Sequence, residues 1–458
     1  MTQSALADLL PAWLPAQRWF AGSGSTVGQV DITSQVTLAD GDPELVHLMV
    51  DVVVGQERVS YQVPVGIRSA LPAVLKRASI GALPDGRIAY DAAADPELTG
   101  ILLSGIAAGR QAGPLRFGTE PGAIIGVHAP ARALPPLASN TSVVFGDEAI
   151  LKLLRRPFAG AHPDLEVPAA LARHGSKLVA APLGWIELTG CGQSDPVPAH
   201  PVQEGEPGSS VLAILSVFFA DSTDGWSLAT ASLRSAANHG ANPDFSGQAR
   251  LLGETTARMH AELAAAFGAS VLPEFALADL VDAMKTELAQ AVRVVPELRA
   301  HAAAVRACYD SLTARGTQVP VQRIHGDYHL AQVLGTEGGW IVLDFEGEPS
   351  VPLARRRAFA PPLRDVAGML RSFDYAGRHE ALSHPDDREL ANAASAWVRA
   401  CQDAFSAGYA DVAGSMPRGS GPLLRALILQ KAVYEAVYEA RHRPGWLPIP
   451  LAAIAEAS

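Results

Sequence analysis

The sequence predicts an α+β protein in which a β-containing N-terminal half leads into a helical C-terminal half. Apolar runs of strand length, separated by Gly, Pro and Asp, dominate the first half. Apolar residues at helical spacing dominate from about residue 211 onward. The exception in the second half is a pair of short apolar runs within residues 324–349, which predicts a β-hairpin embedded among helices.

Residues 1–90 form the first predicted unit. An amphipathic helix at residues 6–20 precedes apolar runs at 45–54 and 59–65, which are expected to be strands. These elements predict a small unit of one helix and a sheet, and no chemical motif occurs in it.

Residues 91–210 are predicted to form a second, β-rich unit, with strands at residues 123–127, 142–145 and 149–154. Residues 167–173 are expected to be part of a helix that starts within the segment 163–172. Residues 211–458 form the third. It begins with a buried strand and a connection at 211–226, a plausible hinge. The helices expected after it lie at residues 227–237, 248–267, 276–290, 296–313, 362–374, 388–407 and 422–443.

Composition narrows the class of protein. A chain of 458 residues with 48% hydrophobic residues is long enough for two or three packed domains. The longest uncharged apolar run, residues 211–220, is too short to cross a bilayer, and the N-terminus lacks the pattern of a signal peptide. Three widely spaced cysteines, Cys191, Cys308 and Cys401, are expected to be reduced thiols. We therefore expect a cytoplasmic protein.

The net charge of −11 argues against nucleic acid or an anionic membrane as the main partner. It does not exclude ATP, because phosphate binding depends on local donors. Only five of the 36 basic residues are lysine, so a lysine within an apolar strand is unlikely to be incidental.

The predicted hairpin carries the strongest chemical signal. Asp327 precedes Gln332 by five residues, and Asp344 ends the returning strand after a Gly-Gly turn. We expect the hairpin to bring Gln332 and Asp344 together. A carboxylate that accepts a hydroxyl proton and oxygen ligands that hold Mg²⁺ are the parts that phosphoryl transfer requires. The residues therefore predict a kinase.

A second signal lies upstream, where a polar turn containing Ser139, Asn140, Thr141 and Ser142 joins two strands. Backbone N–H groups and hydroxyls in such a turn can hold phosphates, but taken alone the signal is weak, because a Ser/Asn-rich hairpin is ordinary turn chemistry. Lys152 follows in an apolar strand, where burial requires an anionic partner unless the side chain points to solvent. Glu166 is a candidate for that partner.

The last predicted helix combines polar and aromatic side chains. Helical spacing places Gln430, Tyr434 and Arg441 on one stripe and Glu435 and Glu439 on its neighbour, with Trp446 just beyond. Such a surface suits a sugar, whose hydroxyls need polar partners and whose CH faces need an aromatic platform. The alternative is a surface helix with internal ion pairs. Three consecutive arginines, 355–357, either face phosphates or lie in a solvated loop.

Taken together, these residues resemble the maltokinases, which are bacterial enzymes of the broader aminoglycoside-phosphotransferase group and are similar to protein kinases. The resemblance extends over nearly the whole chain, and its most specific segments are residues 325–334, 344–349, 363–375 and 434–450. It implies a bilobal protein-kinase-like fold with an additional small N-terminal cap domain, and ATP bound between the β-rich and helical lobes.

The resemblance also implies roles for single residues. Asp327 would be the catalytic base, and Gln332 and Asp344 would be Mg²⁺ ligands, with Glu346 reaching the metal or its water. Lys152 would bind the ATP phosphates and pair with Glu166. Residues 139–142 would cover the phosphates.

Two departures bear on the acceptor. The family's usual His-Leu-Gly-Gln is His329-Leu330-Ala331-Gln332 here, and its usual Leu-Asp-Lys-Ala is Leu429-Gln430-Lys431-Ala432. Replacing Asp by Gln adds a donor to a group that only accepted, so a different hydroxyl pattern should be recognised. We therefore expect the divergent branch of glucosamine kinases, which makes glucosamine 6-phosphate. The alternatives are a maltokinase that makes maltose 1-phosphate, an aminoglycoside kinase, and a nucleotide-binding pseudokinase module.

Overall fold

The computed structural model describes residues 2–20, 27–54, 57–135, 140–190, 209–239, 244–313, 318–348, 351–384, 386–414 and 421–457. Contacts group the chain into two compact units, and each is described by itself. The first unit comprises residues 1–169 and 180–220, and the second comprises residues 170–179 and 221–458. The threefold division expected from the sequence stays a prediction.

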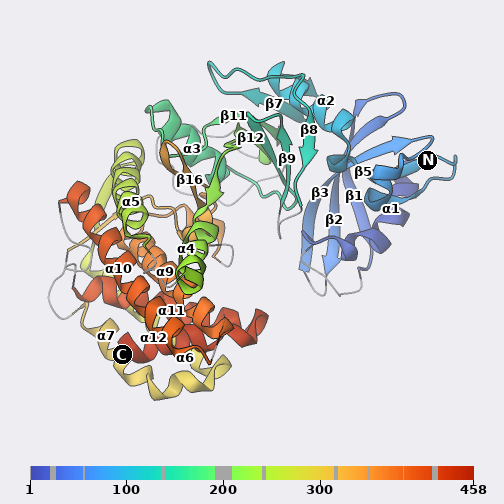
Figure 1. Cartoon of the computed structure of the whole chain (residues 1–458). Helices are drawn as coiled ribbons and strands as arrows, with labels where there is room; N and C mark the ends of the chain where they lie inside the picture. Colours follow the sequence, from blue (N-terminus) through green and yellow to red (C-terminus); the bar gives the residue numbers. More distant parts are fainter. Residues whose placement is uncertain are drawn as a thin grey trace. The chain divides into compact units, whose positions relative to one another are not determined.

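The first unit begins with an antiparallel sheet whose strand order is β1-β2-β3-β5-β4. Its strands β1, β2, β3 and β5 are drawn in blue and labelled in Figure 1. Helix α1 (Thr2–Trp13) packs on this sheet and buries Leu6 and Leu10 with strand residues such as Val50. The strands are β1 (Val30–Ala39), β2 (Glu44–Val54), β3 (Glu57–Arg68), β4 (Ser79–Ala82) and β5 (Ile88–Asp91).

A second, seven-stranded sheet has the order β6-β7-β11-β12-β10-β9-β8, and helix α2 (Pro96–Ala107) packs on three of its strands. The β9–β10 hairpin places Lys152 directly opposite Ser142. Helix α3 (Pro163–Arg173) begins soon after β10. The strands are β6 (Gln111–Ala112), β7 (Leu115–Thr119), β8 (Ala131–Ala133), β9 (Asn140–Phe145), β10 (Ala149–Leu154), β11 (Pro182–Leu188) and β12 (Ser210–Val217).

The two sheets share one hydrophobic core. Leu45 and Tyr90 from the first sheet belong to the same buried cluster as Phe117, Leu151 and Leu215 from the second. A shared core means that burial of apolar surface stabilises both sheets together.

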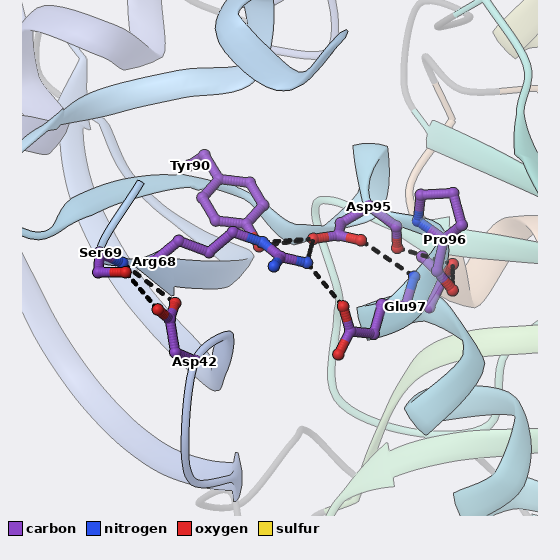
Figure 2. Close-up of polar contacts among 8 residues, drawn as sticks. Asp42, Arg68, Ser69, Tyr90, Asp95, Pro96 and Glu97 are labelled. Carbon is purple, nitrogen blue, oxygen red and sulfur yellow. Dashed lines mark hydrogen bonds and ion pairs between the residues drawn. The ribbon is translucent and has the colours of Figure 1, made fainter. Parts of the chain in front are cut away.

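Polar contacts reinforce this junction (Figure 2). Arg68, at the end of β3, donates to the Tyr90 hydroxyl at 2.9 Å and to Asp95 Oδ2 at 2.8 Å. Its guanidinium also bonds Glu97 at 2.8 Å. Asp95 is the N-cap of α2 and accepts from the backbone N–H of Glu97 at 3.0 Å. One carboxylate therefore ties the first sheet to the helix that packs on the second.

The second unit is mostly helical, with a three-stranded sheet, β13-β16-β17, and a two-stranded sheet, β14-β15. The strands are β13 (Thr223–Asp224), β14 (Ala269–Leu272), β15 (Val319–Gln322), β16 (Val333–Thr336) and β17 (Gly339–Val342). The helices are α4 (Gly225–His239), α5 (Ser246–Phe267), α6 (Glu274–Val294), α7 (Ala302–Asp310), α8 (Leu353–Arg356), α9 (Leu363–Ser383), α10 (Arg388–Ala413), α11 (Pro422–His442) and α12 (Pro448–Ala457).

The elements agree with the expected pattern in most places. The predicted hairpin is β16–β17, and the predicted helix at 422–443 is α11. The predicted strand at 123–127 is wrong: these residues form a loop, and Ile124 is 92% exposed. The apolar run there follows a turn at Pro121 and Gly122 and pairs with no strand in the described part of the chain. The helix expected at 296–313 is divided into a 3₁₀ turn and α7, and α2 and α12 were not predicted.

Within the described part of the chain, no helix is both long enough and apolar enough to span a membrane. The expected cytoplasmic location stays a prediction.

Candidate active site

The loop that carries Asp327 is anchored on the first turn of α9. The Asp365 carboxylate, 1% exposed, accepts from the backbone N–H groups of His325 at 2.8 Å and Gly326 at 2.9 Å. It also contacts Nε2 of His260 at 3.1 Å. Although burial opposes ionisation, the His260 contact and the backbone donors hold the pKa of Asp365 below its ordinary value. Asp365 therefore remains a carboxylate that fixes the start of the loop.

Two further contacts with α9 fix the rest of the loop. The Ser372 hydroxyl of α9 accepts from the Leu330 N–H at 3.0 Å. A Cβ at Gly368 would lie 2.6 Å from the Tyr328 carbonyl oxygen, so only glycine lets the loop approach this helix so closely. The loop is therefore held against α9 at both of its ends.

His325 joins the loop to the end of the hairpin. Its Nε2 lies 2.7 Å from the Leu343 carbonyl oxygen, and its Nδ1 lies 3.3 Å from the Asp327 backbone nitrogen. The carbonyl can only accept and the N–H can only donate, so these contacts assign a neutral ring protonated on Nε2. One imidazole thus connects the backbone at Asp327 with the residue before Asp344.

Asp327 itself lies in a charged setting. Its Oδ1 is 3.3 Å from Nζ of Lys431 on α11, and its Oδ2 is 3.9 Å from Nε2 of His329. The side chain is 20% exposed, which leaves part of the carboxylate accessible. Burial lowers the pKa of His329, although the Asp327 charge opposes this, so the ring is neutral at pH 7.

Gln332 and Asp344 come together at the end of the hairpin, as the sequence predicted. Nε2 of Gln332 donates to Asp344 Oδ2 at 3.0 Å, and the Leu343 N–H bonds the Gln332 carbonyl at 2.9 Å. Asp344 has φ 62°, the left-handed region, which costs a non-glycine residue about 1 kcal/mol or more. An oxygen of Asp344 and an oxygen of Glu346 lie within 4.8 Å of one another.

These oxygens fit a hard divalent cation. Two carboxylates and the Gln332 amide oxygen, whose NH₂ group is turned toward Asp344, supply the ligand type that Mg²⁺ prefers. The metal-binding roles of Gln332, Asp344 and Glu346 stay predictions.

In the first unit, Lys152 forms an ion pair with Asp164 Oδ2 at 2.8 Å. Asp164 lies in the first turn of α3, two residues before Glu166. The pairing of Lys152 with Glu166 stays a prediction, and Asp164 is an additional partner that the sequence reasoning did not name. The sequence does contain a signal that could have pointed to Asp164, because it is an acidic residue in the first turn of a helix.

The polar turn is only partly described. Ser139 lies outside the described residues, whereas Asn140, Thr141 and Ser142 form the start of β9. The Thr141 hydroxyl accepts from Nε of Arg155 at 2.9 Å, so this side chain serves the interior of the unit. The phosphate-covering role of the turn stays a prediction.

The predicted sugar-binding residues of α11 are largely engaged with other protein groups. Gln430 donates to Glu287 at 2.8 Å, and Glu435 accepts two bonds from Arg371, at 2.7 and 2.9 Å. Glu439 accepts from the Tyr375 hydroxyl and from Arg443. The roles of these residues in sugar binding stay predictions.

The other three residues of the predicted sugar-binding set, Tyr434, Trp446 and Arg441, have different surroundings. Tyr434 is half-buried, and its ring lies 4.9 Å from Nζ of Lys431 and 6.4 Å from Tyr438. Trp446 packs against His379, with ring centroids 4.5 Å apart, and Arg441 is exposed.

Comparison with known families defines the class of protein. Residues 131–414 match the phosphotransferase enzyme family, and residues 13–95 match the maltokinase N-terminal cap domain. The chain belongs to the phosphotransferase enzyme family and carries an N-terminal cap domain of the maltokinase type. The predictions of a protein-kinase-like α+β fold with a cap, and of a kinase with an alcohol acceptor, are confirmed.

Particular relatives are more specific. A glucosamine kinase from Streptacidiphilus jiangxiensis is 32% identical over 328 residues, which cover 68% of this chain and 70% of that protein. A glucosamine kinase from Mycolicibacterium smegmatis is 31% identical over 330 residues, covering 69% and 76%. A solved glucosamine kinase in complex with glucosamine, ADP and inorganic phosphate aligns over 98% of both chains with a TM-score of 0.68 and 25% identity.

Proposed function

We propose that this chain is an ATP-dependent glucosamine kinase that makes glucosamine 6-phosphate. The observation that carries the proposal is the likeness, over about two thirds of the chain, to two glucosamine kinases. A solved relative holding glucosamine, ADP and inorganic phosphate shares the fold along nearly the whole chain. The hydrogen-bonded Gln332–Asp344 pair, and the His325 ring that links the Asp327 backbone to the end of the same hairpin, support the same chemistry.

In the proposed reaction, a glucosamine hydroxyl attacks the γ-phosphorus of ATP. A new O–P bond forms, the bond from the γ-phosphorus to the β,γ-bridging oxygen breaks, and the hydroxyl proton passes to the Asp327 carboxylate. ADP is the leaving group. Because the transition state of phosphoryl transfer is loose, Asp327 acts chiefly by orienting the hydroxyl.

Gln332, Asp344 and Glu346 would hold Mg²⁺, which neutralises phosphate charge when bound. Lys152 on β10 of the β-rich sheet would bind the ATP phosphates. Its ion pair with Asp164 holds the ammonium in place before nucleotide arrives.

The match of the cap domain to maltokinases supports maltose as a second candidate acceptor. Residues 13–95 match the cap of maltokinases, so maltose phosphorylated at position 1 is the alternative. Both candidates use the same catalytic groups and differ in the acceptor pocket.

An ADP-release assay across glucosamine, glucose, N-acetylglucosamine, maltose and an aminoglycoside tests the proposal. We expect kcat/KM for glucosamine to exceed that for glucose and N-acetylglucosamine by about 10²-fold or more, because an unmatched polar group is strongly rejected. Phosphorus NMR of the product should show a 6-phosphate. A preference for maltose, or ATP binding without turnover of any sugar, would contradict the proposal.

A further inference from the structure

Lys431 is the charged residue closest to Asp327 among the described contacts, and the family motif alone gives it no role. It lies on α11, 104 residues beyond the loop, and places its ammonium 3.3 Å from Asp327 Oδ1. The Tyr434 ring lies 4.9 Å from the same ammonium. Only 24% of the side chain is exposed, so a charged partner is needed to offset the cost of burial.

The other charged groups nearby leave this pairing in place. Glu348 and Glu435 also face Lys431, but Glu435 already accepts two bonds from Arg371. Burial opposes the charge on Lys431, yet Asp327, Glu348 and Glu435 together raise its pKa above the ordinary value. Lys431 is therefore an ammonium at neutral pH.

Asp327 is faced from two further directions. Arg356 on α8 interacts electrostatically with the Asp327 charge. Its Nε donates to the Val351 carbonyl oxygen at 2.6 Å. His329 is neutral and 3.9 Å from Oδ2, which is beyond hydrogen-bond distance. The two oxygens of Asp327 thus differ: Oδ1 is engaged by an ammonium, whereas Oδ2 has no equally close cation among the residues that the structure describes.

We propose that Lys431 is a positioning residue that holds Asp327 by Oδ1 and presents Oδ2 to the acceptor hydroxyl. The inference rests on the proposed function, because it assumes that Asp327 accepts the hydroxyl proton. An ammonium makes Asp327 a weaker base, but base strength matters little in a loose transition state, whereas orientation matters greatly. Lys431 therefore improves the orientation of the Asp327 carboxylate at the cost of some of its base strength.

The first test replaces the charge. Lys431→Met should lower kcat about 10- to 100-fold, the loss expected when a catalytic group is misplaced by about 1 Å, with KM for ATP unchanged within about twofold. The matched control is Lys285→Met. Lys285 is an ion-paired lysine of α6 in the same unit, with partners Asp282 and Asp310, and its loss should leave kcat unchanged.

A second variant separates positioning from folding. Lys431→Cys should be slow in the same way, and alkylation with 2-bromoethylamine rebuilds a side chain of lysine length by forming a C–S bond and releasing bromide. We expect this treatment to restore at least about a third of the wild-type kcat. Wild-type protein treated identically controls for modification of Cys191, Cys308 and Cys401.

The outcomes discriminate clearly. Wild-type kcat in Lys431→Met overturns the inference, as does a slow, folded Lys431→Cys protein that aminoethylation does not rescue. A thermal unfolding midpoint for each variant within a few degrees of the wild type establishes that the protein is folded. Asp327→Asn, measured in parallel, identifies failure of the underlying function: if that variant turns over normally, Asp327 is not the base, whatever Lys431 does.

Discussion

At the scale of the residue, the candidate active site depends on a few polar atoms that arrive from distant parts of the chain. Asp365 fixes the loop by its backbone, His325 links the loop to the hairpin, and Lys431 holds the carboxylate of Asp327. Together these contacts hold the loop backbone and the Asp327 carboxylate in one orientation.

The Asp327→Asn substitution tests the central assignment. The amide has nearly the same shape but cannot accept the hydroxyl proton, so we expect kcat to fall about 10²- to 10⁴-fold. Nucleotide affinity should persist, because the proposed phosphate and metal groups are unchanged. Steady-state kinetics with an ADP-binding measurement check this, and turnover near the wild-type rate would rule out the assigned role.

The sequence singled out Asp327, Gln332 and Asp344 as candidates because one loop and its hairpin carry them, and it predicted that Gln332 and Asp344 would meet, as they do. It could not place Lys431 beside Asp327, since packing of α11 against the rest of its unit decides that contact. The same reason hid Asp164, whose partner Lys152 lies on a different element.

At the scale of the element, a buried polar clamp made of His47, Gln62 and Arg155 joins β2 and β3 of the cap to the strands of the second sheet. The Gln62 side chain donates to the carbonyl oxygens of Leu154, at 2.8 Å, and Leu212, and its backbone N–H bonds the Arg155 carbonyl at 3.0 Å. These bonds satisfy carbonyls at β10 and β12, the strands that carry and flank Lys152.

Arg155 completes the clamp from the other side. It is fully buried, bonds Asp91 at 2.6 Å and lies 4.7 Å from the centre of the Trp19 ring. A charge buried this deeply is stable only with such a partner. The clamp therefore makes the cap and β10 depend on one another.

Gln62→Leu should destabilise the protein by about 2–4 kcal/mol, because two buried carbonyls lose their donors. We expect Gln62→Leu to have a lower thermal unfolding midpoint than the wild type. The control is Gln29→Leu, at an exposed residue just before β1, and its midpoint should be unchanged. Equal midpoints for the two variants would show that the clamp contributes nothing.

His47 makes the stability of the clamp depend on pH. Burial lowers its pKa from 6.5 to about 4, against the hydrogen bond with Gln62 and in the same direction as the Arg155 charge. Between pH 6.5 and 4 the unfolded chain binds a proton that the folded protein excludes, so stability is lost as pH falls through that window.

The loss should reach about 3 kcal/mol by pH 4, because the pKa of His47 is about 4 in the folded protein and 6.5 in the unfolded chain. His47→Gln keeps a donor toward Gln62 but does not titrate, so its unfolding free energy should fall less steeply. Denaturant unfolding at several pH values measures the difference, and parallel curves for the two proteins would refute it.

At the scale of the whole molecule, the cap and the β-rich sheet belong to one compact unit and share one buried core. Leu45 and Tyr90 share a core with Leu151 and Leu215, and Arg68 is bonded to the N-cap of α2. The cap therefore contributes to folding of the sheet that carries Lys152.

Deleting residues 1–95 tests this dependence. The shortened chain would expose the face of α2 and the core residues of the second sheet, so we expect loss of cooperative unfolding and of nucleotide binding. Circular dichroism and limited proteolysis report the result. A truncated protein that still unfolds in one sharp transition and binds ADP would show that the cap is dispensable.

The sequence by itself determined the α+β order of elements, the hairpin with its three oxygen-bearing side chains, and the kinase class, because local periodicity and spacing encode these features. The tertiary structure alone decided that Lys431 reaches Asp327, that Glu435 of α11 pairs with Arg371, and that one core spans two sheets. Contacts between residues a hundred positions apart depend on how helices and sheets pack, and no local pattern records that packing.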